Sequence, residues 1–126
     1  MTLFEYLKMS EGDFDTYDTK YDAEVTVCYI EEEYETDEYD KFCNGITKKV
    51  NVVKINGDCL IVNWSELIER NMNKFKDFTK KYWKYQYKND IDEFVYQWIS
   101  EIHMYIAGYV SESFYSTLNE FVNTLE

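Results

Sequence analysis

The sequence predicts an α+β fold: one domain over residues 1–126, in which a small antiparallel sheet of about four strands, made from two hairpins, has helices packed on one side. Three observations support this. A chain of 126 residues, 45% of them hydrophobic, can bury one core. Two pairs of short β-rich segments are each joined by a turn, and helical periodicity fills most of the remainder. The expected element order is α-β-β-α-β-β-α-α-α.

The first three elements are a short helix and a hairpin. Apolar residues at helical spacing begin at Leu3, and the helix is expected to stop near residues 10–12. Residues 13–17 and 24–30 are rich in aromatic and β-branched side chains, which favour strands. Residues 18–22 are the expected connection between these two strands.

The middle of the chain predicts a second helix and a second hairpin. The helix is expected to begin after an N-cap at Thr36 and to end at residues 44–45, an Asn-Gly pair. Two β-rich runs, 50–55 and 58–62, then flank a second Asn-Gly pair at 56–57. Asn-Gly is typical of a type I′ hairpin turn, because both central residues of that turn need positive φ.

Three further helices are expected, over residues 63–88, 90–108 and 111–125. The first two begin with a capping-box pattern, in which Asn or Asp is followed three residues later by Glu. All three carry apolar residues near a period of 3.6. Because hairpins rather than crossovers join the strands, the sheet should be largely antiparallel, with the helices gathered on one side.

Charge limits the classes of partner. The chain has 25 acidic and 13 basic residues and a formal net charge of −12, which repels nucleic acid and anionic membranes alike. No apolar run approaches the length of a bilayer span, and no basic leader precedes an apolar stretch at the amino terminus. These features predict a cytoplasmic protein that binds neither membrane nor nucleic acid directly.

The sequence lacks the residue patterns of common catalytic and metal sites. The cysteines Cys28, Cys43 and Cys59 are odd in number and widely spaced, which favours reduced thiols over disulfides or a zinc site. His103 is the single histidine, and its neighbours make it an expected helix-flank residue. The serines lack a glycine-flanked nucleophile motif, and the glycines are scattered. We therefore expect no enzymatic activity, no cofactor and no metal.

The acidic residues cluster in the first part of the chain. More than half of them lie in residues 1–40, where the bases are Lys8 and Lys20. Carboxylates repeated on one face of a strand or helix have intervals that resemble phosphate spacing, so they can occupy a basic track that normally holds nucleic acid. The candidate partner-binding residues are Asp13, Asp15, Asp18, Asp22, Glu24, Glu31, Glu32, Glu33, Glu35, Asp37, Glu38 and Asp40.

A calcium loop is an alternative explanation for part of this cluster. Asp13, Asp15, Tyr17 and Glu24 fall at the first, third, fifth and twelfth positions of an EF-hand-like loop. The sixth position is Asp18 instead of the expected glycine, and strand-like sequence follows instead of a helix. The competing interpretation is a hairpin with a solvated face.

A row of lysines follows in the predicted helix 63–88. Like charges at four-residue intervals repel each other on a helix, so another group should offset them. Interleaved aromatics could bind single-stranded nucleic acid, but the net charge of −12 favours intramolecular neutralisation by the acidic half. The lysines are Lys74, Lys76, Lys80, Lys81, Lys84 and Lys88.

Three segments resemble small proteins carried by phages and mobile elements of Gram-positive bacteria: residues 12–18 (GDFDTYD), 63–71 (NWSELIERN) and 107–112 (AGYVSE). In size, acidity and lack of catalytic motifs the chain also resembles phage-encoded anti-CRISPR and other anti-defence inhibitors. That resemblance implies an inhibitor that acts in the cytoplasm of a bacterial host.

The leading functional expectation is a non-enzymatic inhibitor that binds the basic cleft of a host defence nuclease, such as a Cas effector, through the acids of residues 13–40. Tyrosines would supply interface anchors. The alternative is a structural or regulatory interaction module, monomeric or homodimeric through aromatic helices in residues 90–125, with the acids acting only as solubilising groups. A monomer and a homodimer both remain open.

Overall fold

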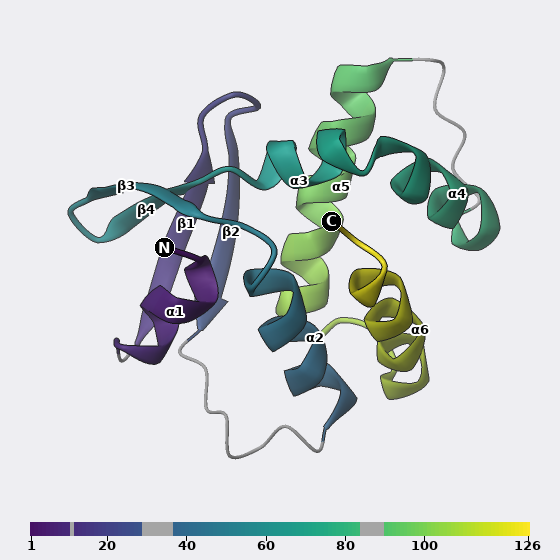
Figure 1. Cartoon of the computed structure of the whole chain (residues 1–126), viewed down its shortest axis with the longest axis horizontal. Coiled ribbons are helices and arrows are strands. Elements are labelled where there is room, and N and C mark those ends of the chain that lie inside the picture. Colours follow the sequence, from purple (N-terminus) through teal and green to yellow (C-terminus); the bar gives the residue numbers. More distant parts are fainter. Residues whose placement is uncertain (11, 29–36, 84–89) are drawn as a thin grey trace.

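The structure, a computed structural model, describes residues 1–10, 12–28, 37–83 and 90–126 and confirms the α+β class (Figure 1). The elements, in chain order, are α1 (Leu3–Lys8), β1 (Asp13–Asp18), β2 (Ala23–Cys28), α2 (Glu38–Thr47), β3 (Val52–Asn56), β4 (Cys59–Val62), α3 (Trp64–Arg70), α4 (Met72–Tyr82), α5 (Ile91–Ile106) and α6 (Glu112–Asn123). The predicted order is therefore correct, except that the first of the three C-terminal helices is divided in two.

The sheet is mixed rather than purely antiparallel. Its strand order is β2-β1-β4-β3, and the two hairpins, β1–β2 and β3–β4, are antiparallel as predicted. The two hairpins join through β1 and β4, which run parallel. Turn chemistry specifies pairing within a hairpin but not which strands of two hairpins meet, so this parallel pair could not be predicted from local sequence.

One face of the sheet belongs to the core. The alternating residues Thr16 on β1, Val25 and Val27 on β2 and Leu60 and Val62 on β4 are buried. The apolar ones among them join a core cluster with apolar residues from all six helices, and Figure 1 shows α2, α5 and α6 grouped beside the sheet. The residues of β1 and β2 that alternate with these buried residues point to the other face of the sheet, toward solvent, because a strand has a two-residue period.

Asp18 ends β1 and lies inside the protein, although the sequence placed it among the surface acids. Its side chain is 2% exposed. Oδ1 accepts hydrogen bonds from the backbone N–H groups of Lys20 and Tyr21, at 3.0 and 3.2 Å, and Oδ2 accepts one from Ser65 at 2.7 Å. The carboxylate therefore closes the β1–β2 turn and satisfies an N–H group in the first turn of α3.

The single helix predicted over residues 63–88 is interrupted at Asn71. This residue has φ −114° and ψ 32°, and it separates α3 from α4. Its buried side chain donates to the carbonyl of Leu67 and accepts from the N–H of Glu126, at 2.9 Å each. The break thus depends on contact with the far end of the chain. The expected continuation beyond Trp83 lies outside the described residues.

Helix α2 also differs from its prediction at both ends. Asp37, rather than Thr36, is the N-cap, and its side chain accepts from the N–H of Tyr39. The helix continues through Gly45 to Thr47. A Cβ at Gly45 would lie 3.3 Å from Cγ1 of Val122, so glycine allows α2 and α6 to approach closely rather than ending the helix.

The β3–β4 turn lies one residue later than predicted. Asn56 pairs with Cys59, which makes Gly57 and Asp58 the central residues. Gly57 has φ +65°, whereas Asp58 does not have positive φ. Positive φ at the first central position alone is typical of a type II′ turn rather than type I′. The hairpin itself is confirmed.

Replacing Asp18 with Asn should destabilise the fold, because an amide N–H₂ would oppose backbone N–H groups that now meet a carboxylate. Hydrogen bonds to charged groups contribute roughly 1.5–3 kcal/mol each, and we expect a loss of about 2 kcal/mol for D18N. The matched control is D15N, an exposed acid on the same strand, for which a change within about 0.5 kcal/mol is expected. Urea unfolding measures both variants, and equal stability of the two would contradict the structural role of Asp18.

Candidate functional site

The predicted acids of the β1–β2 hairpin are brought together on the exposed sheet face. Asp13 and Asp15 alternate on β1 with half-buried Phe14 and buried Thr16, and both acids point to solvent. The register pairs Asp15 with Thr26 and Tyr17 with Glu24, so these side chains share one face. We call Asp13, Asp15, Asp22 and Glu24, together with Tyr17, the acidic sheet face.

Hydroxyl groups hold two of these carboxylates in place. Thr26 Oγ1 donates to Oδ1 of Asp15 at 3.1 Å, across the two strands. The phenol of Tyr17 donates to Oδ1 of Asp22, which lies in the turn with φ +53°. Within the described ranges, no salt bridge involves an acid of the acidic sheet face. Both donors are neutral, so the negative charge of the face is retained.

Tyr17 reports the electrostatic character of this face. The pKa of its phenol is raised above the ordinary tyrosine value, first because the phenol donates to Asp22. Desolvation and the negative charges of Asp22, Glu24 and Asp18 act in the same direction. Lys54 of β3 is on the same face, by its pairing with Ile61, but lies at the opposite edge of the sheet from β2.

The remaining predicted acids lie elsewhere. Asp37, Glu38 and Asp40 belong to the N-terminal turn of α2, where negative charge complements the helix dipole. Glu38 accepts from Asn119 of α6 and from Lys41, and these contacts lower the pKa of the Glu38 carboxyl, that from Asn119 most. This turn is therefore joined to α6 and is not part of the acidic sheet face. The candidates Glu31, Glu32, Glu33 and Glu35 fall outside the described residues.

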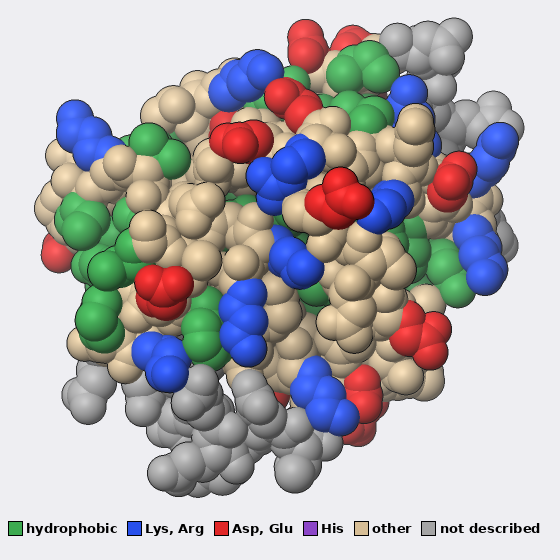
Figure 2. All heavy atoms as spheres, viewed as in Figure 1, with side chains coloured by type: hydrophobic (Ala, Val, Ile, Leu, Met, Phe, Trp, Pro, Cys, Tyr) green, Lys and Arg blue, Asp and Glu red, His purple; other side chains and the backbone are tan. Residues whose placement is uncertain are grey.

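Among the described residues, no salt bridge joins a lysine of α4 to an acid of the first part of the chain. Over the described part of the chain, the ion pairs are Lys20–Glu69, Lys41–Glu38 and Arg70–Glu66. Lys74 donates to the carbonyl of Thr124 instead. Figure 2 shows basic and acidic side chains interspersed over one face of the molecule. The candidates Lys84 and Lys88 lie outside the described residues.

The aromatic side chains of the C-terminal helices are used in the core. Trp98, Tyr105 and Tyr115 are at most 3% exposed. Burial raises the pKa of Tyr115 to about 12 and that of Tyr105 further. These three rings already pack inside one copy of the chain, so they are not available as an exposed aromatic face. The large exposed aromatics among the described residues are Tyr82, Tyr96 and Tyr109.

The calcium alternative does not match the local structure. Its candidate ligands Asp13, Asp15 and Glu24 lie on two paired strands rather than in a loop that leads into a helix. Among the residues that the structure describes, no group of three His, Cys, Asp or Glu side chains is placed to hold a metal ion. Cys43 and Cys59 are present as thiols.

His103 has a role that the sequence did not reveal. Its Nδ1 accepts a hydrogen bond of 3.1 Å from the backbone N–H of Thr26, on the outer edge of β2. Helix α5 thereby protects one edge of the sheet, beside the acidic sheet face. The only sequence signal was a histidine on a helix flank, and its strand partner is 77 residues away.

No known family supplies a role for these residues. No family model matches the chain, and no match is found among the curated proteins or the solved structures. In the described part of the chain, no helix has the length and apolar character to cross a bilayer. The resemblance of residues 12–18, 63–71 and 107–112 to phage proteins therefore stays a likeness of short segments.

The variant D22N should lower the pKa of Tyr17 toward the ordinary tyrosine value. It removes the negative charge beside the phenol and replaces the carboxylate acceptor of the phenol with a neutral amide. NMR titration of protein labelled at the tyrosine ring carbons measures this shift, and Y17F identifies the signal. The control D77N, on α4, should leave the Tyr17 titration unchanged. An unchanged pKa in D22N would show that Asp22 does not hold this phenol.

Proposed function

We propose that the chain is a non-enzymatic inhibitor that places its acidic sheet face in the basic nucleic-acid-binding cleft of a host defence nuclease, such as a Cas effector. The supporting observation is the gathering of Asp13, Asp15, Asp22 and Glu24 on one exposed face without salt bridges in the described residues. The likeness to phage anti-defence proteins supplies the class of target. The acidic face supplies the mode of binding.

The spacing of the face suits a track built for phosphates. Side chains two residues apart on a strand are separated by roughly 6.6 Å. Phosphates along one strand of DNA advance by about 3.4 Å of helix rise per nucleotide. Because the backbone also winds around the axis, neighbouring phosphates are farther apart in space than this rise, which brings their separation close to that interval. Lysines and arginines that contact a nucleic-acid backbone could therefore contact Asp13 and Asp15 in turn.

Pre-ordered side chains favour binding by this face. Fixing a mobile side chain at an interface costs free energy, and Asp15 and Asp22 already have hydroxyl partners in the free protein. Tyr17 is half-buried between them and supplies aromatic contact area at the centre of the face. The field of the acids would accelerate association with a basic partner, and added salt would weaken this effect.

The triple reversal D13K/D15K/E24K should abolish inhibition of a target nuclease, because it replaces the acidic face with a basic one. The matched control D58K/D77K/E120K changes the net charge equally at exposed acids outside the acidic sheet face and should retain inhibition. The measurement is cleavage of a labelled substrate by a panel of purified Cas effectors, at increasing salt. Equal inhibition by both triple variants would contradict the proposal.

A further inference from the structure

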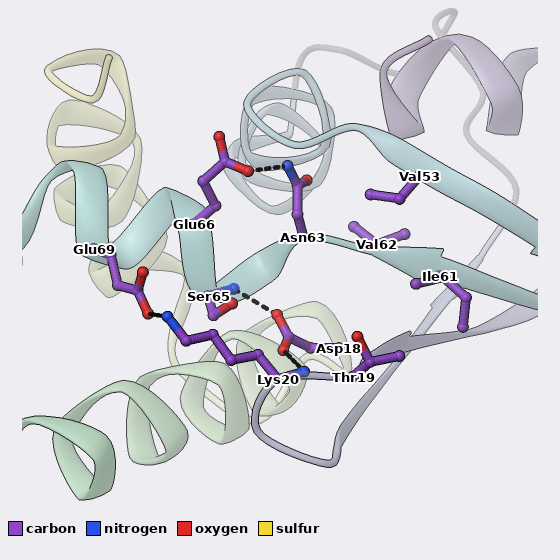
Figure 3. Close-up of a pocket in the computed structure, with 10 residues that line it drawn as sticks. All are labelled: Asp18, Thr19, Lys20, Val53, Ile61, Val62, Asn63, Ser65, Glu66 and Glu69. Atoms are coloured by element: carbon purple, nitrogen blue, oxygen red, sulfur yellow. Dashed lines mark hydrogen bonds and ion pairs between the residues drawn. The ribbon is translucent and has the colours of Figure 1, made fainter.

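A cavity lies beside the acidic sheet face, between the β1–β2 turn, β4 and the start of α3 (Figure 3). Its volume is about 270 Å³. It adjoins the acidic sheet face because Ile61, which lines it, pairs with Tyr17. The other lining residues are Asp18, Thr19, Lys20, Val53, Val62, Asn63, Ser65, Glu66 and Glu69.

The lining combines an apolar wall with an excess of negative charge. Three β-branched side chains from β3 and β4 form the wall. Asp18, Glu66 and Glu69 line the cavity together with a single ammonium group from Lys20. The Glu66 carboxylate is already engaged: it accepts from Nδ2 of Asn63 at 2.6 Å and lies 3.6 Å from Arg70, which does not line the cavity. Asp18 is buried and fully used by backbone N–H groups, so it contributes its field rather than a contact. The two glutamates lie at the accessible rim.

The protein's own lysine already occupies part of this rim. Nζ of Lys20 lies 2.8 Å from Oε1 of Glu69, and that hydrogen bond is the first cause of a raised Lys20 pKa. The Lys20 side chain is 61% exposed, and exposed lysine–carboxylate pairs are weak because water competes for both charges. No hydrogen bond among the described residues uses Oε2 of Glu69. A second cation can therefore reach this carboxylate.

We propose that this cavity receives an arginine side chain of the basic partner, an inference that rests on the proposed function. The aliphatic stem of an arginine would pack on Val53 and Ile61. Its planar guanidinium would offer paired N–H donors to the Glu69 carboxylate, whose Oε2 accepts no hydrogen bond from the described residues. Lysine has one compact ammonium group and no such fork. The cavity therefore favours arginine over lysine, whereas the acidic sheet face binds either cation.

Fluorescein-labelled hepta-arginine and hepta-lysine peptides, measured by fluorescence anisotropy, test this preference. The wild-type chain should bind the arginine peptide roughly tenfold more tightly, a difference of about 1.4 kcal/mol. V53F places a ring at the cavity wall and should reduce the preference to about one. I55F is the matched control, since Ile55 is exposed on the same strand but does not line the cavity. It should keep the preference.

Equal affinity of the wild type for both peptides, or an undiminished preference in V53F, would overturn the arginine site. The reversal D13K/D15K/E24K separates this outcome from failure of the proposed function. It should weaken the binding of both peptides to the same extent, and unchanged binding would count against the acidic sheet face alone.

A second readout needs no variant. In NMR spectra of the wild type, N-acetyl-arginine amide should shift the amide signals of Val53 and Ile61, and an absence of shifts would also overturn the site.

Discussion

The rest of the hairpin depends on the hydrogen bonds that the carboxylate of Asp18 accepts from backbone N–H groups. A buried charge is tolerated only when it is hydrogen-bonded, and Asp18 meets that condition with backbone N–H groups from its own turn and from α3. Two residues earlier, Thr16 donates to the carbonyl of Val25 and accepts from Nε1 of Trp64. Both contacts are on the buried side of β1, so they fix which residues of the strand face the core.

This fixed alternation is what creates the acidic sheet face. A strand has a period of two, so holding Thr16 and Asp18 inward forces Asp13, Asp15 and Tyr17 outward. A register shift of one residue would bury Asp15 and expose the buried threonine, which lies in a hydrogen-bonded network. The exposed acids are therefore positioned by a buried acid on the same strand, together with its partners in α3.

Local sequence was sufficient for much of the fold and for part of the candidate site. The hairpins, the long helix α5 and the exposed positions of Asp13, Asp15 and Glu24 follow from periodicity and turn chemistry. The parallel β1–β4 pair, the break at Asn71 and the burial of Asp18 do not. Each of these depends on residues distant in sequence, with Asn71 and Glu126 separated by 55 positions. Local propensity carries no information about such partners.

The hydrogen-bond partners of the acids divide them into two groups: acids that support the fold and acids that are available to another protein. Asp18 has three backbone donors, and Glu38 is bound to Asn119 and Lys41, so neither carboxylate can contact another protein without cost to the fold. On the acidic sheet face the donors are the hydroxyls of Thr26 and Tyr17. A hydroxyl orients a carboxylate but leaves its charge in place, whereas a lysine would cancel it. A surface that imitates a polyanion needs ordered carboxylates with their charge intact, and neutral donors meet both requirements together.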